Sequence, residues 1–188
     1  MCWNIIQDHT YTVTTPAGAR RTATEPWVID EIHVNSTDTY QCLNVLDRRW
    51  GQKHTGHVYI TGDFAGDSVR STTASVSDYE AIIDRCQAIW GPQNVHKRLM
   101  PNPLVRQRVN AVNAKLKNAR GDRHLFINPK CEHTIEDFRL VQIKEGTDEI
   151  DKSAKFAHLT HHSDAVGYHV YEASLRDKAR NLGTIRRA

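Results

Sequence analysis

The elements predicted along the 188 residues indicate an α/β protein with a mixed sheet: antiparallel early strands, then parallel strands, and helices on both faces. Two observations lead to this fold class. Three strand-like stretches near the start are joined by short loops, which is typical of an antiparallel meander. From about residue 40 onward, helical patterns alternate with short apolar strands, and such alternation favours parallel pairing.

Each predicted element rests on a local pattern. Stretches rich in β-branched and aromatic residues predict strands over 2–7, 11–15, 27–34, 57–61, 95–100 and 124–127. Helical spacing of apolar residues predicts helices over 40–50, 79–90, 103–120, 131–141 and about 160–180. Ser77 and Glu80 read as a capping box, and Asn102 is expected to cap the third helix. This order suits the ribonuclease-H-like architecture, in which acidic residues from separate elements converge at one end of the sheet.

The composition is ordinary for a soluble globular protein, with 39% hydrophobic residues, 25% charged residues and a net charge of +3. The length fits one domain over 1–188, with a tail at 181–188 that we expect to be disordered. The four Cys are far apart and show no CxxC spacing, which argues against a zinc knuckle or a redox motif and fits reduced thiols in a cytosol. No apolar run approaches membrane-spanning length, so no membrane partner is expected.

The first candidate site residue is Asp63, which follows the predicted strand 57–61 and Gly62. A carboxylate at the end of a central strand, beside small residues, is well placed to bind a metal ion, and the glycine lets a phosphate backbone come close. Asp67 is near enough in sequence to assist. The alternative is a strand followed by an ordinary Asp-Gly turn.

The second candidate is Asp164, in the first turn of the last predicted helix. The helix dipole alone favours an acid there, by about 0.3–1 kcal/mol. His161 and His162 lie beside it, but no further ligands follow at zinc spacing. Two acids from different elements suit phosphodiester hydrolysis, in which two Mg²⁺ ions roughly 3.5–4 Å apart activate a water and hold the leaving oxygen.

The third predicted helix carries an apolar stripe that we expect to be buried: Val105, Val109, Val112, Leu116 and Ala119. Arg106 and Arg108 lie off this stripe and are candidates for binding DNA phosphates. Lys152, in a predicted polar loop, and His161 are further candidates for DNA contact. The alternative for each is a solvated surface residue or, for His161, a packed one.

Five motifs follow one another along nearly the whole chain: the residues at 62–66, 102–113, 128–131, 144–152 and 160–168. In content and order they resemble the C-terminal nuclease domain of the large terminase subunit of tailed bacteriophages and prophages. The resemblance implies a ribonuclease-H-like endonuclease that uses Mg²⁺ or Mn²⁺ to cut concatemeric double-stranded DNA in the cytoplasm of a bacterial host. It also implies family partners, namely the terminase ATPase domain, the small terminase subunit and the portal.

In this family three acids bind metal, and Asp63 matches the second and Asp164 the third. The first acid belongs on the first strand, in an Asp-Phe-Asn-like context, whereas this chain begins with residues 1–4, Met-Cys-Trp-Asn. We therefore expect that ligand to be missing, with weak metal binding and little or no cleavage. Asp8 lies at the far end of the strand and is a poor substitute. No GxxxxGK[ST] loop is present, so the chain itself is not the packaging motor.

Three alternatives remain open at the level of the sequence. One is a prophage remnant without catalysis that still binds DNA or the packaging complex. Another is a different ribonuclease-H-like nuclease, such as a junction resolvase or a transposase. The third is a binding module unrelated to nucleases, in which Asp63 and Asp164 share no metal.

Overall fold

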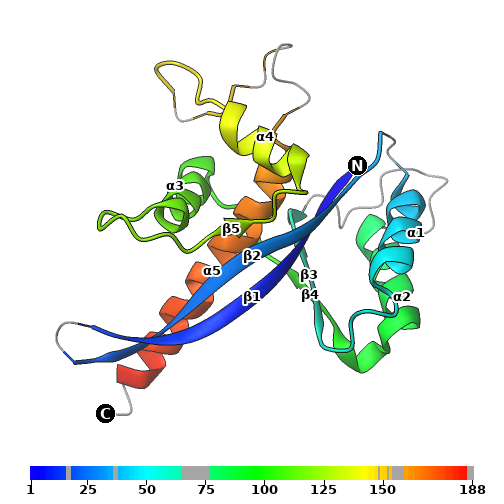
Figure 1. Ribbon diagram of the computed structural model, residues 1–188, viewed down its shortest axis with the longest axis horizontal. Helices are drawn as coiled ribbons and strands as arrows, with labels where there is room; N and C mark the ends of the chain where they lie inside the picture. Colours follow the sequence, from blue (N-terminus) through cyan, green and yellow to red (C-terminus); the bar gives the residue numbers. More distant parts are fainter. Residues whose placement is uncertain are drawn as a thin grey trace. The chain divides into compact units, whose positions relative to one another are not determined.

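The computed structural model describes residues 1–15, 18–35, 38–64, 77–147, 149–151, 153 and 159–182, together with the backbone of 183–185 (Figure 1). By its internal contacts the chain divides into two compact units. The first unit comprises Met1–Trp3 and Ile32–Asn102, and the second comprises Asn4–Glu31 and Pro103–Ala188. Among the described helices, none combines the length and the apolar character needed to cross a membrane.

Strands and helices are mixed along the chain. Their order is β1 (Cys2–Thr14), β2 (Arg20–His33), α1 (Thr39–Trp50), β3 (Val58–Gly62), α2 (Asp78–Trp90), a 3₁₀ turn (Pro92–Asn94), β4 (Val95–Leu99), α3 (Val105–Leu116), β5 (Phe126–Ile127), α4 (Glu132–Leu140) and α5 (His161–Ile185). The predicted α/β class, with antiparallel early strands followed by parallel strands, is confirmed.

The early strands form a long hairpin rather than the predicted meander of three. Residues 2–7 and 11–14 belong to one strand, β1, and the Asp8 side chain between them is bound by His169 and Arg176 of α5. Met1 and Val34 exchange two backbone hydrogen bonds of 2.8 and 3.0 Å, the pattern of an antiparallel pair. β5 then pairs in parallel with β2.

In the second unit, α5 covers the hairpin along its length (Figure 1). Contacts run from Asn4 with His162 at one end to Thr22 with Asn181 at the other. The core between these elements contains the fully or nearly buried residues Val28, Val112, Leu125, Cys131, Val166 and Val170. Because α5 continues to Ile185, the first part of the predicted tail at 181–188 is helical, and 186–188 lie outside the described residues.

The first unit holds the parallel pair β3–β4, whose five residue pairs run from Val58↔Val95 to Gly62↔Leu99. Helix α2 begins with the predicted capping box: Ser77 and Glu80 exchange backbone-to-side-chain hydrogen bonds of 2.6 and 3.2 Å. The helices bury a small apolar core made of Cys42, Leu43, Leu46 and Cys86. Burial raises the pKa of the Cys86 thiol to about 12, so it stays protonated at neutral pH and is a poor nucleophile.

Candidate functional site

Asp63 lies directly beyond the carboxyl end of β3 and is half-buried. A Cβ atom at Gly62, the last residue of the strand, would collide with the Tyr79 hydroxyl, so a larger residue there would have to displace the Tyr79 side chain. The backbone N–H of Phe64 donates a 3.1 Å hydrogen bond to Oδ1 of Asn102. Asp63 is thus held by strand β3 before it and by the hydrogen-bonded backbone of Phe64 after it. Asp67 lies outside the described residues.

Contrary to the prediction, Asn102 does not cap α3. The helix begins at Val105 after Leu104, with no side-chain cap, and the Asn102 amide instead accepts from Phe64. β4 ends at Leu99, so Asn102 approaches from the carboxyl end of the strand next to β3. The carboxyl ends of two adjacent parallel strands therefore supply Asp63 and the amide that fixes the backbone after it. This is the kind of strand end at which open α/β sheets bind ligands.

Asp164 lies in the first turn of α5, as predicted, and its backbone N–H donates to the carbonyl of Thr160 at 2.8 Å. Thr160 has φ 90°, the left-handed conformation that a non-glycine residue rarely adopts, and it turns the chain into the helix. The Asp164 side chain is 23% exposed. Its Oδ1 accepts a 2.7 Å hydrogen bond from Nη2 of Arg108.

Arg108 is buried, with only 5% of its surface exposed, which corrects the prediction that it lies off the buried stripe of its helix. The buried residues of α3 are Arg108 and Val112. Arg108 can be buried because its charge is paired with that of Asp164. Its guanidinium also lies 4.4 Å from the centre of the Tyr168 ring. Nη1 of Arg108 is buried and has no hydrogen-bond partner within the described part of the chain.

The other predicted DNA contacts fall in different surroundings. Arg106 is exposed on α3, and His161 is exposed at the start of α5. Lys152 lies outside the described residues. The structure therefore brings Arg108 and Asp164 together and leaves Arg106 and His161 on the surface.

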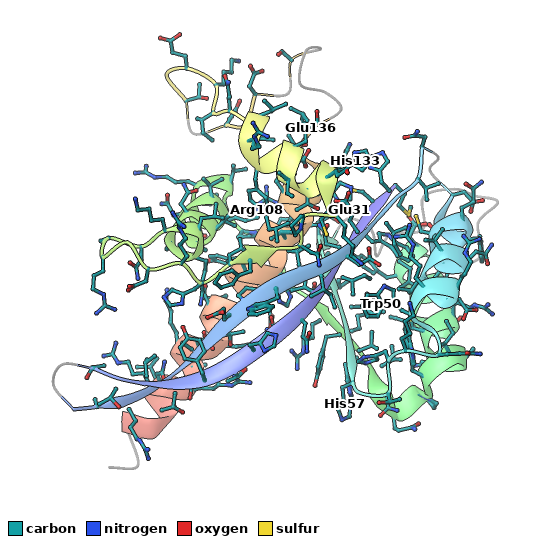
Figure 2. All side chains as sticks on the ribbon, viewed as in Figure 1. Glu31, Trp50, His57, Arg108, His133 and Glu136 are labelled. Carbon is teal, nitrogen blue, oxygen red and sulfur yellow. The ribbon has the colours of Figure 1, made fainter. Side chains whose placement is uncertain are left out.

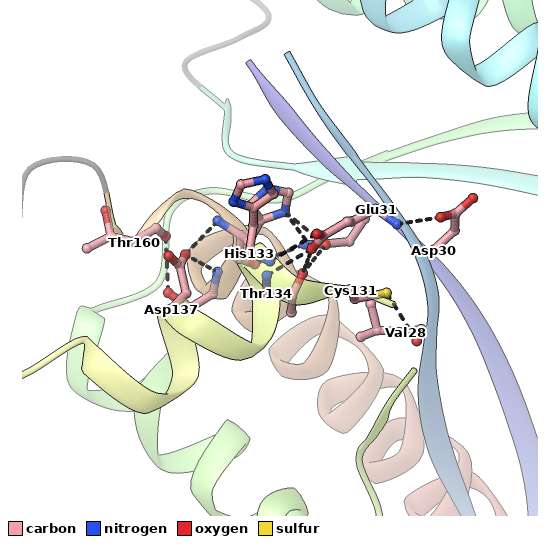
Figure 3. Close-up of polar contacts among 11 residues, drawn as sticks. Val28, Asp30, Glu31, Cys131, His133, Thr134, Asp137 and Thr160 are labelled. Atoms are coloured by element: carbon pink, nitrogen blue, oxygen red, sulfur yellow. Dashed lines mark hydrogen bonds and ion pairs between the residues drawn. The ribbon is translucent and has the colours of Figure 1, made fainter. Parts of the chain in front are cut away.

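A buried polar cluster around Glu31 was missed by the sequence analysis (Figure 3). The Glu31 carboxylate accepts hydrogen bonds from the backbone N–H groups of His133 and Thr134, at 3.0 and 2.8 Å, and from the Thr134 hydroxyl at 2.7 Å. Burial alone would raise the pKa of Glu31, but the hydrogen bonds from Thr134 and His133 and the charge of His162 lower it. The signal in the sequence that could have revealed this cluster was an acidic residue, Glu31, inside an apolar strand.

His162 and Asn4 complete this cluster. The Nδ1 atom of His162 lies 3.0 Å from Oδ1 of Asn4, and the Asn4 amide nitrogen donates to the His162 carbonyl at 2.9 Å. The ring of His162 is 2% exposed and stacks on His133, with ring centres 5.9 Å apart. His162 is therefore a packed residue that joins the start of α5 to β1, and its neighbour His161 is the surface residue.

Asp8 is fully engaged within the second unit. Its two oxygens accept from Nε2 of His169 at 2.7 Å and from Nη2 of Arg176 at 3.1 Å. Burial would raise the pKa of Asp8, but these two partners lower it to about 2. The carboxylate joins β1 to α5.

The donor set at Asp63 and Asp164 is chemically suited to Mg²⁺ or Mn²⁺, which prefer carboxylate oxygens. Within the described residues, no group of three or more His, Cys, Asp or Glu side chains is arranged to hold a metal ion. Asp63 belongs to the first unit and Asp164 to the second, so their joint action stays a prediction. Any metal at Asp164 has to share its carboxylate with Arg108 or displace that side chain.

Comparison with known proteins adds no family assignment: no family model matches the chain, and neither the curated proteins nor the solved structures contain a match.

Proposed function

We propose that this chain is a ribonuclease-H-like endonuclease domain of the phage-terminase type, which uses Mg²⁺ or Mn²⁺ to cut double-stranded DNA in the cytoplasm of a bacterial host. The observation that carries the proposal is the position of Asp63. It extends from the carboxyl end of the parallel strand β3, and Asn102, which follows the adjacent strand β4, anchors the backbone after it. In open α/β sheets this end of parallel strands is where ligands bind.

The start of α5 supports the same proposal. Asp164 is held in a fixed direction by Arg108, and Thr160 with its φ of 90° sets the entry into the helix. Arg106 is an exposed cation on the neighbouring α3, suited to a DNA phosphate. In such an enzyme the bound ions would activate the attacking water and stabilise the leaving oxygen.

The test is nicking of supercoiled plasmid by the purified protein with Mn²⁺, followed by Asp63→Asn and Asp164→Asn. We expect each substitution to reduce the nicking rate by at least about 100-fold, because the loss of a metal ligand costs more than the 10–100-fold typical of outer-shell changes. Asp122→Asn and Asp47→Asn are matched controls, because each acid binds a side chain of its own unit, Asn118 and Arg85 respectively, and within the described residues has no hydrogen bond to either candidate.

Retention of nicking in Asp63→Asn would contradict the proposal. So would nicking by the wild type that persists in excess EDTA. A folded wild-type protein that fails to nick with Mn²⁺ would agree with the little or no cleavage expected from the sequence, and would favour the second candidate function, a module that binds DNA or the packaging complex without cutting.

The second candidate is favoured by one observation, the ion pair in which Arg108 already neutralises Asp164. If binding is the whole function, Asp164→Asn should leave DNA affinity unchanged. Arg106→Gln should weaken DNA binding and reduce its salt dependence by about one phosphate contact. Titration of labelled duplex DNA at two salt concentrations measures both effects.

A further inference from the structure

We propose that His57 and His96 form a two-imidazole chelate for a divalent first-row transition metal, such as Ni²⁺ or Cu²⁺, on the β3–β4 sheet. Both residues belong to the first unit. His57 directly precedes β3 (Figure 2), and His96 is the second residue of β4. Nδ1 of His57 lies 3.0 Å from Nε2 of His96, and the pair is exposed to solvent.

The strand register explains why the two rings meet. Tyr59 pairs with His96 across the parallel strands, and His57 lies two residues before Tyr59, on the same face of the sheet. The ring centres of His57 and His96 are 5.1 Å apart. The backbone ladder of five residue pairs therefore fixes the positions from which both imidazoles extend.

The two nitrogens lie within the range that a chelate requires. Two imidazole nitrogens that bind one ion at about 2.1 Å, at adjacent corners of a square or an octahedron, are about 3.0 Å apart. Tetrahedral coordination requires roughly 3.4 Å between the nitrogens. The observed 3.0 Å is the length of the hydrogen bond between the two rings, and it places the nitrogens close enough for both to bind one ion.

Neighbouring side chains hold His96 in place. Its ring stacks on Tyr59 with centres 5.0 Å apart, and the guanidinium of Arg98 lies 3.5 Å from the centre of the Tyr59 ring. These contacts limit the rotation of His96, while His57 is exposed and can turn until both lone pairs converge on one ion. In the metal-free protein the same two nitrogens share a hydrogen bond, which the ion would replace.

Imidazole ligands distinguish this site from the carboxylates at Asp63 and Asp164. Imidazole suits nickel and copper, whereas Mg²⁺ prefers oxygen. His57 and His96 lie at the amino ends of β3 and β4, and Asp63 lies beyond the carboxyl end of β3. The chelate is thus independent of the nuclease proposal, and neither result decides the other.

The experiment is isothermal titration of the untagged protein with Ni²⁺ in the presence of excess Mg²⁺, with His57→Gln, His96→Gln and the double variant. We expect one Ni²⁺ site in the wild type and an affinity loss of about tenfold or more in either single variant, because the second imidazole acts at high effective concentration. The double variant should bind Ni²⁺ no more tightly than either single variant, and its loss should be smaller than the sum of the two single losses, since both residues serve one site.

His33→Gln is the matched control, because His33 is another exposed histidine of the first unit, at the end of β2. It should keep the Ni²⁺ site, as should Asp63→Asn. Circular dichroism of each variant tests that the fold is intact. Equal Ni²⁺ affinity in wild type, His57→Gln and His96→Gln would overturn the proposal, and so would loss of the site in His33→Gln.

Discussion

Arg108 of α3 is buried because three neighbours on α5 accommodate it. Asp164 accepts its hydrogen bond, Tyr168 lies against its guanidinium, and Gly167 leaves room for its aliphatic stem. A Cβ atom at residue 167 would come within 2.9 Å of Cγ of Arg108. The small residue in the 164–168 stretch thus permits the close approach of α3 to α5.

We predict that Gly167→Ala destabilises the protein by about 1–3 kcal/mol through overpacking against Arg108. In a helix interior the same change normally stabilises by roughly 1 kcal/mol, so the sign of the effect is diagnostic. Urea unfolding at neutral pH measures the difference in the free energy of unfolding.

The matched background is Arg108→Ala, in which the space beside residue 167 is open. There Gly167→Ala should be neutral or stabilising, which a double-mutant cycle would report as a coupling between the two positions. A destabilisation of the same size in both backgrounds would mean that Arg108 is not the cause.

Among the helices, α4 and α5 are capped by carboxylates from other elements. Glu31 of β2 accepts the backbone N–H groups of His133 and Thr134 at the start of α4. Asp137 of α4 accepts those of His162 and Ser163 at the start of α5, both at 2.9 Å (Figure 3). These groups satisfy donors that a helix start leaves unpaired, and the negative charge also suits the helix dipole.

Removal of the cap on α5 should be measurable. We predict that Asp137→Ala lowers the free energy of unfolding by about 1–2 kcal/mol, because one buried and one partly buried N–H group lose their acceptor. Glu136→Ala is the control, since Glu136 is the adjacent acid on α4 and is exposed (Figure 2). Thermal unfolding should show a lower midpoint for Asp137→Ala and little change for Glu136→Ala. Similar midpoints for the two variants would contradict the capping role.

For the molecule as a whole, the lowered carboxylate pKa values predict sensitivity to acid. Asp8 has an ordinary pKa of 3.8 and a pKa of about 2 in the folded chain, and the pKa of Glu31 is lowered as well. A carboxylate whose pKa is lower in the folded chain than in the unfolded chain stabilises the protein at pH values above its ordinary pKa. This stabilisation is lost as the pH falls through the pKa that the group has in the folded chain. The part due to Asp8 is therefore lost between about pH 4 and pH 2.

We predict that Asp8→Asn destabilises the protein at pH 7 by up to about 2 kcal/mol and removes part of the stability loss below pH 4. Urea midpoints measured from pH 7 to pH 2 test this expectation. The wild-type and variant curves should converge toward pH 2. Parallel curves over the whole range would show that His169 and Arg176 do not set the charge state of Asp8.

The sequence alone was sufficient for elements whose signals are local. The capping box of Ser77 and Glu80 begins α2, and Val112 of the apolar stripe predicted for α3 is buried. It was insufficient where distant residues decide. Asp8 resembles a strand break until its α5 partners are known, and Arg108 resembles a surface cation until Asp164 is beside it. Glu31 escaped notice because its donors are backbone groups about a hundred residues away.

The long-range carboxylate contacts also bear on how the chain folds as it is made. Glu31 reaches Thr134, 103 residues later, and Asp177 of α5 accepts the backbone N–H and the hydroxyl of Thr24, 153 positions earlier. Contacts so distant in sequence are costly to close and favour slow folding. On a ribosome the β1–β2 hairpin must wait, with its apolar face uncovered, until α5 emerges. The second unit is therefore expected to need protection from aggregation during synthesis.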